Sequence, residues 1–88
     1  MAIRKRILQV ILDRAFVDLR SAPAAARAAA ENGADLIQYR DKTSSARDFL
    51  EVACAIRKAL DGSGVPLVVN DRLDIALAAG ASGVHLGQ

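Results

Sequence analysis

The stretch Leu36-Ile37-Gln38-Tyr39-Arg40-Asp41-Lys42 joins a short strand-like run to a charged end, and the rest of the chain repeats this arrangement. Successive side chains of a strand point to opposite faces, so Gln38 and Arg40 share one face and Lys42 follows just beyond the strand. A planar guanidinium and a mobile ammonium together suit a polyanion. Charges at a strand end are equally common as solvated surface residues, so this stretch alone favours neither interpretation.

Similar strand-like runs occur on both sides of this stretch, and segments with helical spacing separate them. The predicted strands cover residues 7–12, 36–40, 65–69 and 83–86, and the predicted helices cover residues 23–32, 46–60 and 73–79. Gly33 and Gly80 end the first and third helices. This alternation predicts an α/β fold with a parallel sheet and helices packed outside it. The periodicity fits a barrel and an open sheet equally well.

Two of the helices carry recognisable start signals. Pro23 suits the first turn of the first helix, and Ser21 lies upstream as a candidate cap. Ser44 or Ser45 can cap the second helix, and Asp48 is placed to complete a capping box from Ser45.

The composition excludes several classes of function. Hydrophobic residues make up 52% of the 88 residues, aromatic residues only 3%, and the net charge is +2. An RNA-binding sheet needs exposed aromatic side chains for stacking, and nucleic-acid binding needs clustered basic residues, so we expect no nucleic-acid partner. No apolar run approaches the length of a membrane span, so we expect no membrane partner either.

A single cysteine, Cys54, excludes an internal disulfide and indicates a cytoplasmic protein. Cys54 lies inside the second predicted helix, where we expect a buried structural thiol. The basic residues of the first six positions lead into an apolar run too short for a signal peptide, so a basic lead-in to the first strand is the better interpretation.

A second group of polar residues, Asn70-Asp71-Arg72, directly follows the third predicted strand. Asn70 can offer an amide to a ligand, and Asp71 can bind Mg²⁺, which prefers a few carboxylates together with phosphate oxygens and water. The plainer alternative is that Asn70 or Asp71 caps the following helix, and the pattern alone favours that alternative.

A third group, Gly80-Ala81-Ser82-Gly83-Val84-His85-Leu86-Gly87-Gln88, contains the fourth strand. Gly87 and Gln88 fall at its carboxyl end, whereas His85 within the apolar run is interpreted as a packed core residue. All three groups therefore lie at the carboxyl ends of predicted parallel strands. In a barrel, that shared rim is where active sites form.

These residues resemble the motifs of thiamine phosphate synthases. Gln38-Tyr39-Arg40-Asp41-Lys42 resembles the Gln-x-Arg-x-Lys motif of that family, and Val68-Val69-Asn70-Asp71-Arg72 resembles its strand ending in Asn-Asp-Arg. Residues 80–88 resemble its Gly-Ala-x-Gly-Val-His-Leu-Gly-Gln segment. Residues 10–14 resemble its first strand, which usually carries Thr where Leu12 stands.

The resemblance implies a (β/α)8 TIM barrel that joins a pyrimidine diphosphate to a thiazole phosphate, with Mg²⁺ assisting loss of the diphosphate. It implies that Gln38, Arg40, Lys42 and Asn70 bind the pyrimidine diphosphate and that Asp71 binds the metal. Arg40 and Lys42 would act catalytically by stabilising the departing charge. Such a reaction needs cations and a metal rather than a nucleophile.

The resemblance also implies that part of the barrel lies elsewhere, because the family pattern continues beyond Gln88. We expect residues 1–88 to form one partial TIM-barrel domain, the N-terminal half of the barrel, ending after its fourth strand. Open strand edges then predict self-association or a longer gene product, and we expect the isolated chain to lack synthase activity.

Two alternatives stay open from the sequence. A related thiazole tautomerase-like barrel is disfavoured by the joint presence of Arg40, Lys42, Asn70 and Asp71, because such an enzyme has less need of a diphosphate and metal site. A non-catalytic half-barrel that binds phosphate or a partner chain is the other alternative, and diphosphate binding that gains nothing from Mg²⁺ would favour it.

Overall fold

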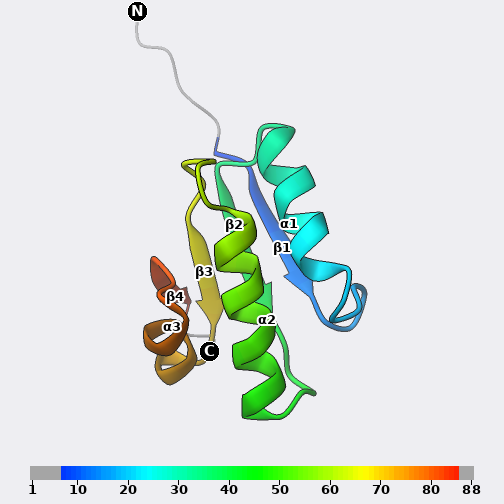
Figure 1. Cartoon of the computed structure of the whole chain (residues 1–88), viewed down its shortest axis with the longest axis vertical. Helices are drawn as coiled ribbons and strands as arrows, with labels where there is room; N and C mark the ends of the chain where they lie inside the picture. The colour runs from blue at the N-terminus through cyan, green and yellow to red at the C-terminus, as the bar shows by residue number, and fades with distance from the viewer. Residues whose placement is uncertain (1–6, 86–88) are drawn as a thin grey trace, which may run out of the picture.

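Four parallel strands and three helices alternate along the chain (Figure 1). The structure is a computed structural model, and it describes residues 7–85. The strands are β1 (Gln9–Asp13), β2 (Leu36–Arg40), β3 (Leu67–Asn70) and β4 (Gly83–His85), and the helices are α1 (Ala22–Glu31), α2 (Ala46–Ala59) and α3 (Leu73–Ala79). The predicted element order is confirmed, with β1 and β3 displaced slightly toward the C-terminus from the predicted strands. Leu86, the predicted last strand residue, lies outside the described residues.

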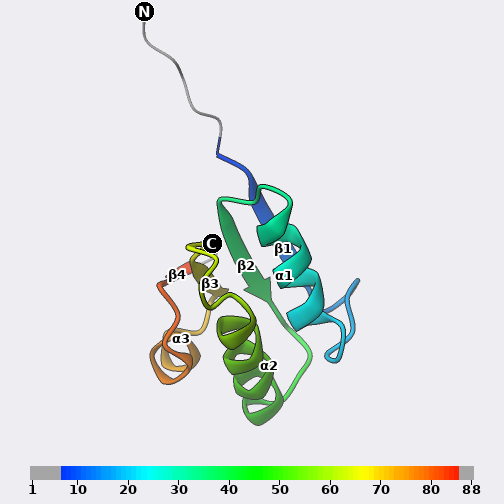
Figure 2. The same cartoon turned by 45° about the horizontal axis from the view of Figure 1, so that its top comes forward.

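The strands follow one another in the sheet in chain order, β1-β2-β3-β4, and every neighbouring pair is parallel. Each strand is therefore joined to its neighbour by a single helix. The helices form one layer in which α2 packs against both α1 and α3. Figure 1 shows α1 and α2 side by side over one face of the sheet, and the tilted view of Figure 2 shows the same layer beside the strands.

The register divides the strand residues between two faces. Leu12 pairs with Tyr39 and Tyr39 pairs with Val69, and all three are buried. Their neighbours of the other parity, such as Ile11, lie on the face without helices, and Ile11 is 51% exposed. The core therefore lies between the sheet and the helix layer, as alternating strand side chains require.

The core combines aliphatic strand residues with one large ring from α2. Phe49 and Ile56 of α2 are at most 1% exposed, and the Phe49 ring meets the Tyr39 ring edge to face, with 5.3 Å between centroids. On α1, Ala22 and Ala26 are the buried residues. Small alanine side chains let α1 approach the sheet closely, so the alanine-rich segment predicted as a helix packs as one.

The helix starts agree with the sequence at α2 and differ at α1. The Ser45 hydroxyl accepts a hydrogen bond from the Asp48 amide at 3.2 Å, which confirms the predicted cap. Ser21 precedes α1, but its side chain makes no capping hydrogen bond. Asp18 Oδ1 instead accepts from the amides of Arg20 and Ser21, at 2.9 and 2.8 Å. The predicted Ser21 cap is therefore wrong, because the turn before α1 already supplies an acceptor.

The backbone at the two predicted helix-ending glycines has positive φ, +100° at Gly33 and +70° at Gly80. Glycine adopts this region without steric cost, which confirms both predicted helix ends.

Cys54 is exposed, so the expectation of a buried thiol is wrong. The buried residues of α2 are Phe49, Val52, Ala53 and Ile56. A helix turns by about 100° per residue, so Cys54, one position after Ala53, leaves the buried stripe for the solvent side. Within residues 7–85, no helix has the length and hydropathy of a membrane span.

Candidate functional site

The carboxyl ends of β1, β2 and β3 form one edge of the sheet, which we call the rim. Asp13 pairs in register with Arg40 at the ends of β1 and β2, and Asn70 ends β3. Lys42 and Asp71 follow β2 and β3 directly. Parallel pairing therefore brings residues that are far apart in the sequence to the same edge, as the strand pattern predicts.

Three amide side chains form a ladder across the face that the helices leave open. Gln38 Nε2 donates to Gln9 Oε1 at 3.2 Å, and Asn70 Nδ2 donates to Gln38 Oε1 at 3.1 Å. Gln38 is 5% exposed and Asn70 is 9% exposed. Buried amides lose few hydrogen bonds when such a ladder satisfies them, so β1, β2 and β3 hold Gln38 and Asn70 in fixed positions.

The rim cations form ion pairs with acidic neighbours. Arg40 Nε lies 3.6 Å from Asp13 Oδ2, and Lys42 Nζ lies 3.6 Å from Asp71 Oδ2. The Arg40 and Lys42 side chains are 45% and 59% exposed. Solvated ion pairs of this kind contribute little stability, so a stronger anion can displace the carboxylates without disturbing the fold.

Asp71 has an unusual backbone conformation for its residue type, with φ of +63°. Asp and Asn adopt this left-handed region more readily than other side-chain-bearing residues. Arg72 occupies the position before α3, so the interpretation of Asn70 or Asp71 as its cap is wrong. The turn instead sets the Asp71 carboxylate beside Lys42 at the rim.

Arg72 belongs to the helix side of this turn. Its guanidinium donates to both carboxylate oxygens of Asp74, at 3.0 and 2.9 Å, and lies over the Phe49 ring. The hydrogen bond from Arg72 lowers the pKa of Asp74 to about 2. Arg72 therefore anchors the start of α3 rather than joining Arg40 and Lys42.

Tyr39 and Asp41 lie on the side of β2 opposite to Gln38 and Arg40. Both are buried, and the Tyr39 hydroxyl donates to Asp41 Oδ2 at 2.9 Å. Burial opposes the charged form of Asp41, but hydrogen bonds from Ser44, Thr43 and Tyr39 hold the pKa of this carboxyl below its usual range. Burial, together with the Asp41 hydrogen bond and charge, raises the pKa of Tyr39 well above its ordinary value.

The raised pKa of Tyr39 predicts a loss of stability at high pH. Because the folded pKa exceeds the unfolded value of about 10, the contribution is complete below that pH and is lost as pH rises toward the folded pKa. The slope approaches about 1.4 kcal/mol per pH unit from this group. In Tyr39→Phe this part of the decline in the free energy of unfolding should be absent. Urea unfolding at several pH values above about 9 measures the difference. Identical pH profiles for the two proteins would contradict this prediction.

The rim contains the predicted site residues Gln38, Arg40, Lys42, Asn70 and Asp71, together with Asp13, which the sequence analysis missed. Gln9, also missed, begins β1 away from the rim and contacts Gln38 through the amide ladder. Asp13 and Gln9 reach the same face because they share the parity of Gln38 and Arg40 in the register. Alternate residues of a strand share a face, so placing β1 beside β2 in the sequence analysis could have identified both residues.

Part of the third sequence group falls outside what the structure describes. The fourth strand is present, and the Asn70 backbone pairs in register with His85. The side chain of His85 and the residues Gly87 and Gln88 lie outside the described residues, so their predicted placement stays a prediction. Among the described residues, no group of three or more His, Cys, Asp or Glu side chains could hold a metal ion.

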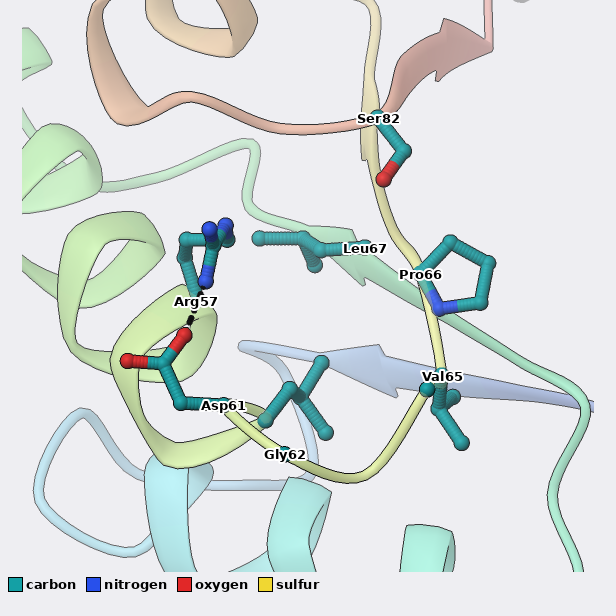
Figure 3. Close-up of a pocket in the computed structure, with 9 residues that line it drawn as sticks. Arg57, Asp61, Gly62, Val65, Pro66, Leu67 and Ser82 are labelled. Carbon is teal, nitrogen blue, oxygen red and sulfur yellow. Dashed lines mark hydrogen bonds and ion pairs between the residues drawn. The ribbon is translucent and has the colours of Figure 1, made fainter.

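A cavity of about 300 Å³ lies at the opposite edge of the sheet, where β3 and β4 begin (Figure 3). Its lining includes Arg57, Pro66 and Ser82, and Arg57 bonds to Asp61. In α/β folds ligands bind at the carboxyl ends of the strands, and this cavity lies at the amino ends. The convergent amides and charges therefore make the rim, rather than the cavity, the candidate site.

Comparison with known proteins identifies a family and several relatives of this chain. A sequence model of the family described as thiamine monophosphate synthase matches residues 8–88. The thiamine-phosphate synthase of Agrobacterium fabrum is 55% identical over 80 residues, which cover 91% of this chain and 36% of that protein. A probable thiamine biosynthetic bifunctional enzyme, chloroplastic, of Oryza sativa is 54% identical over 69 residues, covering 78% of this chain and 13% of that protein.

A solved structure shows the same likeness in three dimensions. The thiamine phosphate pyrophosphorylase from Pyrococcus furiosus matches with a TM-score of 0.76 and 35% sequence identity, over 89% of this chain and 37% of that one. The chain thus spans little more than a third of the length of the synthases it matches.

Proposed function

This chain belongs to the thiamine monophosphate synthase family, and from that premise we propose that it supplies the pyrimidine-diphosphate side of a thiamine phosphate synthase. The reaction joins hydroxymethylpyrimidine diphosphate to hydroxyethylthiazole phosphate and releases diphosphate. The observation that carries the proposal is the convergence of two motifs at one rim. Gln38 bonds to Asn70, and Lys42 pairs with Asp71.

We propose further that residues 1–88 form the N-terminal half of a (β/α)8 barrel. Open doubly wound sheets reverse their strand order partway, with helices on both faces. Here the strands follow chain order and the helices occupy one layer, which is the arrangement of a barrel segment. In such a barrel the open face with Gln38 and Asn70 is the interior, closed by strands that this segment does not contain.

The rim residues have distinct roles in this proposal. Arg40 and Lys42 bind the diphosphate and stabilise the negative charge that grows as it departs. Gln38 and Asn70, fixed by the amide ladder, hold the pyrimidine and its methylene group in one orientation. The roles need no nucleophile, and exchange of a carboxylate partner for the diphosphate leaves both cations paired.

Mg²⁺ is the proposed cofactor, and the residues fit it in part. Mg²⁺ is usually held by one or two carboxylates together with substrate phosphates and water. Asp71 offers one partly exposed carboxylate at the rim, close to Lys42, where a bound diphosphate would supply further oxygens. When bound, the ion would neutralise charge on the leaving diphosphate.

Asp71→Asn tests this proposal through diphosphate binding. Asn tolerates the left-handed backbone of position 71, so the substitution removes the charge and keeps the turn. In the parent chain we expect Mg²⁺ to strengthen binding of inorganic diphosphate about tenfold or more, and in the variant we expect most of that gain to disappear. Without Mg²⁺ the variant binds diphosphate at least as well as the parent, because Lys42 no longer faces an opposing carboxylate.

Isothermal titration calorimetry measures the diphosphate affinity with and without Mg²⁺. Asp74→Asn is a matched control. Asp74 is an exposed carboxylate in the first turn of α3 that pairs with Arg72 rather than with Lys42 or Arg40. Diphosphate binding that gains nothing from Mg²⁺ in the parent chain would favour a non-catalytic phosphate-binding half-barrel instead.

The remaining parts of the proposal concern the chain outside the site. We propose a cytoplasmic protein whose isolated segment lacks synthase activity, because residues that bind the thiazole phosphate belong to the rest of the barrel. The outer edges of β1 and β4 have no strand partner within residues 7–85, which supports self-association of the segment or its pairing with the rest of a barrel.

A further inference from the structure

Asp41 stands between two residues of the proposed diphosphate site, yet its side chain points away from that site. It is 8% exposed and lies on the helix side of the sheet, next to Tyr39. Its Oδ1 accepts hydrogen bonds from the amides of Thr43 and Ser44, at 3.0 and 2.9 Å. The Thr43 hydroxyl also donates to Oδ1, at 3.4 Å.

The two carboxylate oxygens of Asp41 bond to different parts of the molecule. Oδ2 accepts from the hydroxyl of Tyr39, a core residue whose ring packs edge to face on Phe49. Oδ1 accepts from two amides of the backbone segment that connects β2 to α2. One buried carboxylate thus joins the core to the rim loop, residues 41–45.

Lys42 lies within this loop, between Asp41 and the two amides that Asp41 holds. Its side chain projects toward the rim, where its Nζ reaches the Asp71 carboxylate at 3.6 Å. A lysine side chain has many rotamers, so its ammonium is placed accurately only when the backbone beneath it is fixed. Within residues 7–85, Asp41 is the residue whose side chain bonds to both loop amides, at 43 and 44.

We propose that Asp41 is a positioning residue for diphosphate binding. It fixes the rim loop against Tyr39 so that Lys42 is held beside Asp71 before the ligand arrives. This inference rests on the proposed function, because it takes diphosphate as the ligand of Lys42. Asp41 would therefore affect substrate binding from the core without touching the substrate.

Asp41→Asn is the primary test. The substitution removes the charge and one of the two accepting oxygens. The loop amides then bond to a neutral and weaker acceptor, and the new amide nitrogen has to donate to the Tyr39 hydroxyl oxygen. We expect hydrogen exchange at the Thr43 and Ser44 amides to quicken about tenfold or more, measured by NMR on the 88-residue chain. We expect the affinity for inorganic diphosphate with Mg²⁺ to fall about fivefold, the cost of ordering one long side chain on binding.

Two further variants separate positioning from general destabilisation. Ile56→Val removes one buried methyl group from α2, away from the rim loop, and should leave diphosphate affinity unchanged at temperatures where the chain is folded. Tyr39→Phe keeps the bonds from Asp41 to the loop but frees Oδ2, so it should give an intermediate loss of affinity. Tyr39→Phe also provides the test if Asp41→Asn does not fold.

The outcomes distinguish this inference from the proposed function. Parent chain that fails to bind diphosphate would overturn the proposed function and this inference with it. Parent chain that binds diphosphate, with Asp41→Asn binding equally well, would overturn only the role of Asp41. Unchanged exchange at Thr43 and Ser44 in Asp41→Asn would overturn it as well, whatever the affinity. A loss of affinity in Ile56→Val equal to that in Asp41→Asn would show that stability alone is responsible.

Discussion

Arg40→Gln is expected to lower kcat/KM for thiamine phosphate formation by about 10²- to 10³-fold in a barrel completed by a relative's C-terminal part. Arg40 ends β2 at the rim and is held beside Asp13, at 3.6 Å. Gln keeps polarity and much of the length but loses the charge and the planar fork that can bind two phosphate oxygens at once. The loss should therefore appear in the chemical step as well as in binding, since charge on the diphosphate grows as it departs.

The experiment joins residues 1–88 to the part of the Agrobacterium fabrum synthase that follows its matched segment, to which this chain is 55% identical. The fusion should form thiamine phosphate from both substrates with Mg²⁺, whereas the isolated chain should not. Steady-state kinetics on the fusion then compare the parent with Arg40→Gln.

Arg47→Gln is the matched control for this substitution. Arg47 is an exposed arginine of α2 that pairs with Glu51, and the same change there should leave kcat/KM within about twofold of the parent. If Arg40→Gln and Arg47→Gln have the same activity, Arg40 does not bind the diphosphate. An inactive parent fusion would count against the proposed barrel half itself.

Phe49→Ala is expected to destabilise the chain by about 3–5 kcal/mol, a large fraction of the roughly 5–15 kcal/mol typical of a folded domain. Phe49 is 1% exposed and is the large ring between α2 and the sheet. Its loss removes the edge-to-face contact with Tyr39 and the surface under the Arg72 guanidinium. Both the rim loop after β2 and the turn after β3 depend on these contacts.

Urea unfolding followed by circular dichroism measures this loss, with Phe49→Leu as the matched control. Leu refills part of the volume without the ring, so its cost should be clearly smaller than that of Ala. A cost below about 1 kcal/mol for Phe49→Ala would mean that this ring does not hold α2 on the sheet.

The element order could be predicted because each strand and helix carries its own local signal. Each of the strands β1, β2 and β3 comes from an apolar run in which alternate residues face the core. Tyr39 and Val69, which pair in register, are examples, and both are buried. Strand order could not be read from the same signals, because periodicity records which face is buried but not which strand is the neighbour.

Two predictions were wrong because residue type does not record local geometry. Ser21 has the right residue type for a cap, but Asp18 reaches the same turn first. Cys54 lies in an amphipathic helix next to apolar residues, but the buried stripe includes Ala53 and excludes the next residue. In both cases the residue type was informative, and the outcome depended on geometry a few ångströms away.

The positions of the candidate site residues were predicted more completely than the residues that support them, and their roles stay a prediction. Gln38, Arg40, Lys42, Asn70 and Asp71 were assigned from motifs, and the structure brings them to one rim. Asp41, within the same motif, was not assigned, because its side chain takes the opposite parity and serves the core. Residues that act through their neighbours leave no chemical signature of their own in a motif.

The order β1-β2-β3-β4 has a consequence for how the chain is synthesised. Every strand pairs with the strand made just before it, so a nascent chain can add one strand and one helix at a time without waiting for distant segments. The rim would then form in stages during synthesis. Arg40 would meet Asp13 when β2 docks, and Lys42 would meet Asp71 only after β3 has emerged.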